Sequence, residues 1–138
     1  MFTSFETYER FIYQLGETVA SIEASTVVLI RRGRVIAVVR GEIHFKNNIR
    51  LHVYEDLTSI PTLQITGYGY EIYRGDEKLY WYDSQPHPHI PELASTDPHH
   101  KHIPPDIKHH RIPAPGLSFT QPNLPFLIQE IERELLNT

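Results

Sequence analysis

Apolar residues near the N-terminus recur at intervals of three and four positions, the spacing of one face of a helix. The positions are Phe5, Tyr8, Ile12, Leu15, Val19 and Ile22. Thr3 and Glu6 are spaced as a capping box, in which a hydroxyl and a carboxylate satisfy the free amides of a helix start. The pattern therefore predicts an amphipathic helix over residues 4–23.

The apolar period changes to two at Ser25, where β-branched residues become frequent. Asn47-Asn48 tolerates positive φ and suits a tight turn between two strands. Gly41 indicates a bulge or a close approach of two backbones. We expect about five antiparallel strands over residues 25–83.

Two features of these strands have alternative interpretations. His44 and His52 fall on the polar faces of neighbouring strands, where an imidazole pair could bind an ion, although two solvent-exposed side chains is the simpler interpretation. Gly67 and Gly69 lie inside a predicted strand. This placement favours close packing against a helix over phosphate binding.

Helical spacing returns at the C-terminus. Asn123 is a candidate N-cap, Pro125 suits the first turn, and apolar residues follow to Leu135. This predicts a helix over residues 123–137. We therefore expect one α+β domain over residues 1–138, with an antiparallel sheet of about five strands and both helices packed on one face.

A proline- and histidine-rich tract occupies residues 84–122. Residues 86–125 hold ten of the eleven prolines and seven of the nine histidines. Because proline removes backbone donors and fixes φ, this composition favours extended or polyproline conformation. We expect an ordered loop tract, wrapped over its own domain or held by a neighbour, with a disordered linker as the alternative. An ordered segment of this length is usually functional.

Charge and cysteine content restrict the chemistry. The chain has no cysteine, which excludes disulfides, thiolate metal sites and cysteine nucleophiles. The net charge of −4 argues against nucleic-acid binding over the whole surface, although residues 31–50 are basic. A solvated strand face is the simpler explanation of that basic segment. The candidates for binding an anionic substrate are Arg31, Arg34, Arg40 and Arg50.

No apolar run approaches the roughly 20 residues that a membrane helix requires. The N-terminus also lacks the basic residue before an apolar stretch that marks a signal peptide. We therefore expect no membrane segment and a cytoplasmic location.

Two His-x-His units lie in the tract, His87/His89 and His100/His102. In extended backbone, side chains two positions apart point the same way, so each unit can present two imidazoles to one point. The two pairs could together bind a divalent metal through four nitrogens, although no spacing demands a metal and we expect none to be required.

The same residues suit acid–base chemistry. Histidine titrates near neutrality, so two imidazoles can act as base and acid while Lys101 offsets charge on a phosphoryl group. That set would suffice for metal-independent RNA cleavage through the 2′-hydroxyl. The structural alternative is that the rings hydrogen-bond the carbonyls of the loop. The candidate catalytic residues are His87, His89, His99, His100, Lys101, His102 and Asp83.

A family resemblance rests on residues 51–55 and 68–73 of the predicted strands and above all on this tract. Tyr82-Asp83 leads into Pro86-His87-Pro88-His89-Ile90-Pro91-Glu92-Leu93 and then Pro98-His99-His100-Lys101-His102. Over about residues 41–136 the chain resembles the TumE-like proteins, the toxin half of bacterial type II toxin–antitoxin pairs. Residues 107–115 resemble a cyanobacterial-type branch. The resemblance implies a cytoplasmic toxin encoded beside a helix-turn-helix antitoxin.

Three hypotheses follow. The first is an RNA-directed toxin, a metal-independent ribonuclease whose histidine-rich tract is the active site. The second is a non-enzymatic binding module whose tract docks an antitoxin or a second subunit of a homodimer. The third is a metal-binding regulator that uses the His-x-His pairs.

Overall fold

The computed structural model describes residues 2–84, 99–104, 111–113 and 116–137, except for the side chains of 111–113. His87 and His89 lie outside the described residues. The helices are α1 (Phe5–Thr18), α2 (Leu124–Ile131) and a π-helical segment that continues α2 (Glu132–Leu136). A 3₁₀ turn spans Lys46–Asn48. The strands are β1 (Ile22–Ser25), β2 (Val28–Arg31), β3 (Ile36–Phe45), β4 (Ile49–Thr58), β5 (Gln64–Arg74), β6 (Glu77–Asp83), β7 (His100–His102) and β8 (Arg111–Pro113).

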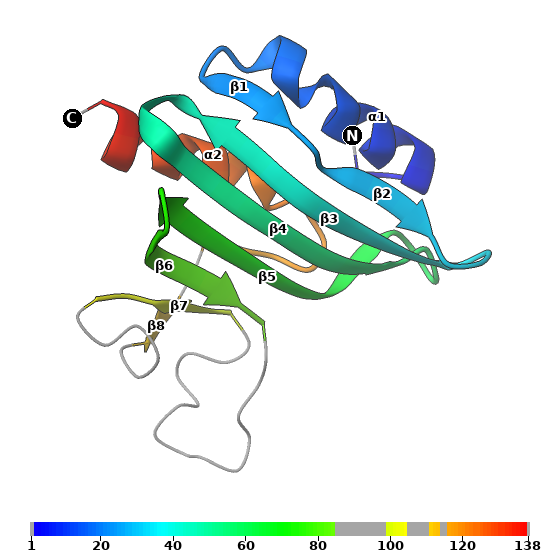
Figure 1. Ribbon diagram of the computed structural model, residues 1–138. Coiled ribbons are helices and arrows are strands. Elements are labelled where there is room, and N and C mark those ends of the chain that lie inside the picture. Colours follow the sequence, from blue (N-terminus) through cyan, green and yellow to red (C-terminus); the bar gives the residue numbers. More distant parts are fainter. Residues whose placement is uncertain (1, 85–98, 105–110, 114–115, 138) are drawn as a thin grey trace.

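Within the described residues, all eight strands belong to one antiparallel sheet (Figure 1). The order is β1-β3-β4-β5-β6-β7-β8, and β2 pairs with β3 beside β1. The predicted α+β class is confirmed. The additional strands come from the ends of the predicted sheet: β1 begins inside the predicted N-terminal helix, and β7 and β8 lie in the predicted loop tract.

The two helices cover the same face of the sheet, as predicted (Figure 1). The Tyr8 hydroxyl of α1 donates to Glu55 on β4, and Asn123 at the start of α2 donates to the Tyr70 hydroxyl on β5. Glu55 and Tyr70 therefore point to the helix side. The core between the layers is apolar, and apart from such polar contacts it consists of aliphatic and aromatic side chains.

Helix α1 is shorter than the predicted helix over 4–23. Val19 has extended backbone angles of φ −113° and ψ 110°, and β1 begins at Ile22. Both residues continue the helical apolar spacing by coincidence, because a strand that enters the same core also needs apolar residues. The cap is also shifted by one residue. Ser4 and Thr7 exchange capping hydrogen bonds in place of Thr3 and Glu6.

The predicted turn and close approach in β3–β4 are both present. Asn47 and Asn48 each have φ of 62° and form the turn. Gly41 has φ of 143°, and a Cβ at this position would lie 2.6 Å from the Thr26 carbonyl oxygen. A glycine is therefore required where the β1–β2 connection passes over β3.

Strand alternation gives the sheet a second face, directed away from α1 and α2, which we call the outer face. Its central row crosses five strands in register. The row consists of Glu42, His52, Glu71, Trp81 and His102. Polar and aromatic residues thus cover the side of the sheet that the helices leave free.

One carboxylate is buried on the helix side. Glu55 is fully buried and accepts hydrogen bonds from the Tyr8 hydroxyl at 2.6 Å and the Tyr70 hydroxyl at 2.5 Å. Burial raises the pKa of Glu55, although the two tyrosine hydrogen bonds act in the opposite direction.

Among the described residues, no helix is both long enough and apolar enough to span a bilayer.

Candidate functional site

Pairing of β7 with β6 brings two histidines to one aspartate. His100 lies opposite Asp83 in the register, and His102 lies opposite Trp81. The Nε2 atom of His100 forms an ion pair with Asp83 Oδ1, and the Nε2 atom of His102 lies 3.0 Å from Asp83 Oδ2. We call Asp83, His100 and His102 the histidine–aspartate cluster. The predicted convergence of the His100/His102 pair is confirmed.

The imidazoles of the cluster are buried, whereas the carboxylate is partly accessible. His100 is 0% and His102 is 2% exposed, against 29% for the Asp83 side chain. Burial by itself would raise the pKa of Asp83, but hydrogen bonds and charge from the two histidines outweigh it and hold that pKa well below its usual range. The carboxylate is therefore ionised at neutral pH.

Packing fixes the orientation of His102. Its ring stacks on Trp81 with 4.4 Å between centroids. Its Nδ1 atom is buried and has no hydrogen-bond partner in the described part of the chain. Nε2 is thus the atom of His102 that is directed at the cluster.

The other expected members of the constellation lie on the helix side of the sheet. The Lys101 ammonium lies 3.2 Å from Glu130 of α2 and over the rings of Tyr80 and Tyr82. Since strand side chains alternate, the residue between His100 and His102 must point away from them. The sequence interpretation required Lys101 to lie beside the two imidazoles. The structure places it on the opposite face, so that part of the prediction is wrong.

His99 is also separated from the cluster. Its ring stacks on Tyr68 and contacts Phe119, and its Nδ1 lies 2.5 Å from the Tyr68 hydroxyl. Burial, followed by the neighbouring charge of His100, lowers the pKa of His99. The geometry gives His99 a packing position on the helix side.

The cluster has the donor set of a divalent-metal site. One atom from each of its three residues lies within 4.8 Å of the others. Two imidazoles and a carboxylate form a common ligand set for zinc and other first-row divalent metals. The other predicted metal ligands, His87 and His89, lie outside the described residues.

A pocket of about 320 Å³ opens beside the cluster on the outer face. We call it the Gly69 pocket; it is lined by His52, Tyr54, Gly69, Glu71, Trp81, Tyr82 and Asp83. Asp83 belongs to both the pocket and the cluster. A molecule in the pocket would therefore meet the accessible side of the carboxylate that holds the two histidines.

Comparison with protein families identifies the chain. The family model described as Toxin TumE matches residues 10–135, nearly the whole sequence. The chain belongs to the TumE toxin family. No curated protein matches it, and neither does any solved structure. The TumE match includes every residue of the cluster and the pocket, and the cyanobacterial-type branch stays a prediction.

The four predicted substrate-binding arginines are spread over this TumE-family fold. Arg31 forms an ion pair with Glu6 of α1 and lies over the Phe5 ring, on the helix side. Arg34 lies in the turn before β3. Arg40 lies on the outer face opposite Tyr54. With Arg50, discussed next, only two of the four point to the outer face.

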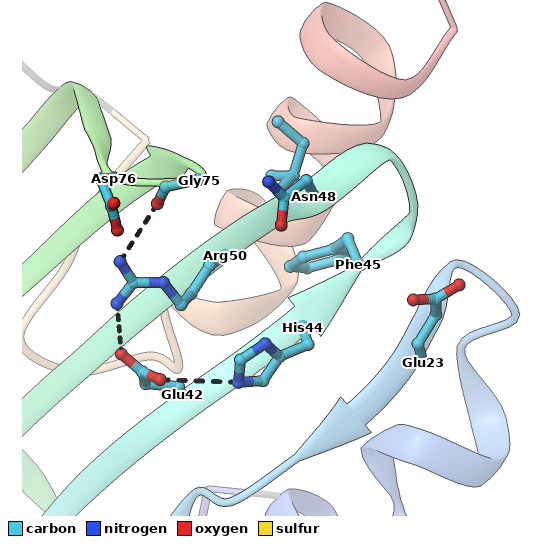
Figure 2. A pocket seen from close by; sticks show the side chains of 9 residues that line it. Glu23, Glu42, His44, Phe45, Asn48, Arg50, Gly75 and Asp76 are labelled. Carbon is cyan, nitrogen blue, oxygen red and sulfur yellow. Dashed lines mark hydrogen bonds and ion pairs between the residues drawn. The ribbon is translucent and has the colours of Figure 1, made fainter.

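Arg50 belongs to a second polar group on the outer face (Figure 2). It donates to Glu42 at 2.5 Å and to the Gly75 carbonyl at 3.3 Å. His44 lies 3.5 Å and His52 3.7 Å from the same Glu42 carboxylate. The predicted His44/His52 pair therefore shares a carboxylate at the edge of a pocket of about 640 Å³. The Arg50 guanidinium is already bound to Glu42 and to the Gly75 carbonyl, which limits its availability for a substrate.

Sequence reasoning missed Trp81 and Tyr54 as site residues and gave Gly69 a different role. The sequence feature that could have indicated the pocket was Gly69 itself, because glycine is unfavourable in the interior of a strand. Tyr68 and Tyr70 both point to the helix side, so Gly69 points to the outer face. The expected packing against a helix is therefore wrong for Gly69.

Proposed function

We propose that this chain is the toxin of a type II toxin–antitoxin pair and that it cleaves RNA at the histidine–aspartate cluster. Membership of the TumE family supports the toxin role. The observation that carries the site is the convergence of His100 and His102 on Asp83 at the wall of the Gly69 pocket. No other group in the described residues combines these donors so closely.

The geometry favours a metal-assisted reaction over the metal-independent one expected from the sequence. Metal-independent cleavage needs two accessible imidazoles and a nearby cation. In the described structure both imidazoles are buried, and Lys101 lies on the opposite face with Glu130. A divalent ion between Asp83, His100 and His102 would supply the missing positive charge, polarise a phosphoryl oxygen and activate a water molecule.

The protein's own residues provide position and charge in this scheme. Asp83 holds both Nε2 atoms toward one point, and Trp81 fixes the His102 ring by stacking. Arg40 on the outer face adds a positive charge that can attract a phosphate backbone, with the salt sensitivity such contacts have.

The biological setting is part of the same proposal. The partner is an antitoxin encoded beside the toxin gene, of helix-turn-helix type, and the toxin acts in the cytoplasm. A tract that docks the antitoxin, or a homodimer interface, is the competing non-enzymatic role. Under that role the cluster would be structural, so a substitution in it would reduce toxicity only where it also unfolds the protein.

The test combines growth and RNA cleavage. We expect induced expression to arrest growth and the product of the adjacent gene to reverse the arrest. His102→Gln should remain folded, but it should need at least a tenfold higher inducer dose than wild type to arrest growth. His44→Gln is the matched control, because His44 lies on the same face and is 44% exposed.

Purified protein distinguishes the two kinds of chemistry. Cleavage of single-stranded RNA that stops with EDTA and returns with added Mn²⁺ or Zn²⁺ supports the metal-assisted reaction. Cleavage that persists in EDTA but is lost in His102→Gln supports acid–base use of the same residues. Full toxicity of folded His102→Gln would refute the site.

A further inference from the structure

Gly69 leaves a gap in the side chains of the outer face. It lies in the interior of β5, with Tyr54 of β4 and Asp83 of β6 as its partners in the register. The adjacent row carries side chains at all three positions, His52, Glu71 and Trp81. The floor of the Gly69 pocket is therefore bare backbone surrounded by aromatic and carboxylate side chains.

Neither the backbone nor close packing requires a glycine at this position. Unlike Gly41, Gly69 does not have positive φ. A Cβ added to it would meet no heavy atom within 4 Å in the described part of the chain. The register shifts of β5 lie between Asp56 and Leu57 of β4 and between Ile72 and Tyr73, so no bulge explains Gly69 either. A strand glycine without such a reason is typical of a place where a ligand or another backbone approaches closely.

The walls of the pocket indicate what that molecule is. Tyr54 is 40% exposed and offers a ring edge and face. The Glu71 carboxylate already accepts from Tyr73 and Lys78, and the Asp83 carboxylate is paired with the cluster histidines, but each carboxylate oxygen can accept a further hydrogen bond from a ligand in the pocket. The volume of about 320 Å³ lies at the small end of the range for ligand pockets. A flat ring with N–H donors at its edge matches this combination, and nucleobases are such rings.

We propose that the Gly69 pocket binds one nucleobase of a single-stranded RNA and thereby sets where the RNA is cut. This inference rests on the proposed RNA-cleaving function for its biological meaning. Asp83 lines the pocket and also holds His100 and His102. A base seated over Gly69 would therefore bring the sugar and phosphate of its own nucleotide beside the cluster.

Trp81 gives a direct readout of binding. It is the only tryptophan in the chain and it lines the pocket, so ligands that enter should change its fluorescence. The probes are the four nucleoside 5′-monophosphates, with ribose 5-phosphate as the probe that lacks a base. We expect saturable quenching by at least one nucleotide and none by ribose 5-phosphate.

Gly69→Leu places a side chain in the pocket, and its Cβ would meet no heavy atom within 4 Å in the described part of the chain. The matched control is Gly16→Leu, at an exposed helix position where an added Cβ also meets nothing within 4 Å. Gly69→Leu should weaken nucleotide affinity at least tenfold while its circular dichroism and melting temperature stay close to wild type. Gly16→Leu should bind like wild type. Identical titrations for wild type and Gly69→Leu would overturn the inference, as would equal quenching by ribose 5-phosphate.

A second arm separates RNA from free nucleotides. A short 2′-O-methyl RNA titrated in EDTA, a combination that prevents both attack by the 2′-hydroxyl and metal-assisted hydrolysis, should bind more tightly than the mononucleotide. Binding of mononucleotide without binding of this RNA would overturn RNA as the ligand. Base-dependent quenching in a protein that cuts no RNA supports the pocket and removes the proposed function, whereas RNA cleavage unchanged by Gly69→Leu overturns the pocket alone.

Discussion

Lys101 and His102 are adjacent in the chain but serve opposite faces of the sheet. The Lys101 ammonium lies 3.2 Å from Glu130 of α2, whereas His102 Nε2 lies 3.0 Å from Asp83 on the outer face. Neighbouring side chains of a strand point to opposite faces of the sheet, so adjacent residues of β7 are separated in this way. The two residues therefore differ in what their loss should do.

Lys101→Gln should reduce stability more than it reduces chemistry. Glu130 is buried and also accepts the Tyr82 hydroxyl at 2.6 Å, so removing the ammonium leaves a buried carboxylate with less compensation. We expect a loss of about 1–3 kcal/mol in the free energy of unfolding. Urea denaturation measures it.

His102→Gln is the comparison for Lys101→Gln. It should lower toxicity without a comparable loss of stability. Toxicity should be compared at a temperature where both variants are folded. If folded Lys101→Gln lost toxicity as completely as His102→Gln, Lys101 would have to act in the reaction despite its position on the helix side.

The sequence predicted correctly that histidines converge at this site, but it did not predict correctly which other residues lie beside them. The His-x-His spacing correctly placed His100 and His102 on one side, since that follows from local geometry. The same alternation places Lys101 and His99 on the opposite side, a consequence that the predicted catalytic set did not take into account. Proline density around the tract indicated a loop, and three paired residues are too short to produce an apolar pattern.

The position of Asp83 relative to the histidines could not be read from the sequence. Asp83 was a candidate only as part of the string before the tract. Its place opposite His100 depends on the β6–β7 register, which long-range pairing sets. The same holds for the Gly69 pocket, whose three walls come from three strands.

Glu55→Gln should show a pH-dependent gain in stability. The folded-state pKa of Glu55 is raised above its ordinary value of 4.5 by burial. As pH rises through 4.5, the unfolded chain loses this proton first, so wild-type stability falls until the folded carboxyl also ionises. Glutamine does not titrate and avoids this loss.

Unfolding free energies of wild type and Glu55→Gln from pH 4 to pH 8 provide the measurement. The difference, Gln minus Glu, should grow with pH from near the ordinary value of 4.5. Both variants share all other titrating groups, so the difference isolates residue 55. A difference that shrinks with rising pH would show that the Tyr8 and Tyr70 hydrogen bonds outweigh burial.

Gly41→Ala should destabilise the fold severely. Its φ of 143° disfavours a side chain, and the new Cβ would lie 2.6 Å from both Thr26 O and Val27 Cα. Strain and overlap together should cost about 3 kcal/mol or more. Thermal unfolding checks this, with Gly16→Ala on exposed α1 as the control expected to gain about 0.5 kcal/mol. Equal melting temperatures for Gly41→Ala and wild type would contradict the close approach of β3 to residues 26 and 27.

Metal should stabilise the protein without being needed for its folding. The core beneath α1 and α2 does not involve the histidine–aspartate cluster, so EDTA should leave the melting temperature within a few degrees of the untreated protein. If the proposed metal site is correct, added Zn²⁺ should bind the folded chain at Asp83, His100 and His102 in preference to the unfolded chain. Linkage then predicts a gain of about 2.7 kcal/mol at a free concentration of about 100 Kd.

Differential scanning fluorimetry with increasing Zn²⁺ tests this linkage, and the variants make it specific. His102→Gln removes one of three ligands and should abolish the Zn²⁺-dependent rise, whereas His44→Gln should keep it because His44 lies near Glu42 and away from the cluster. A collapse of the melting temperature in EDTA would make the metal structural. A rise that survives in His102→Gln would place the ion elsewhere, and the histidine–aspartate cluster would then have to act without metal or not at all.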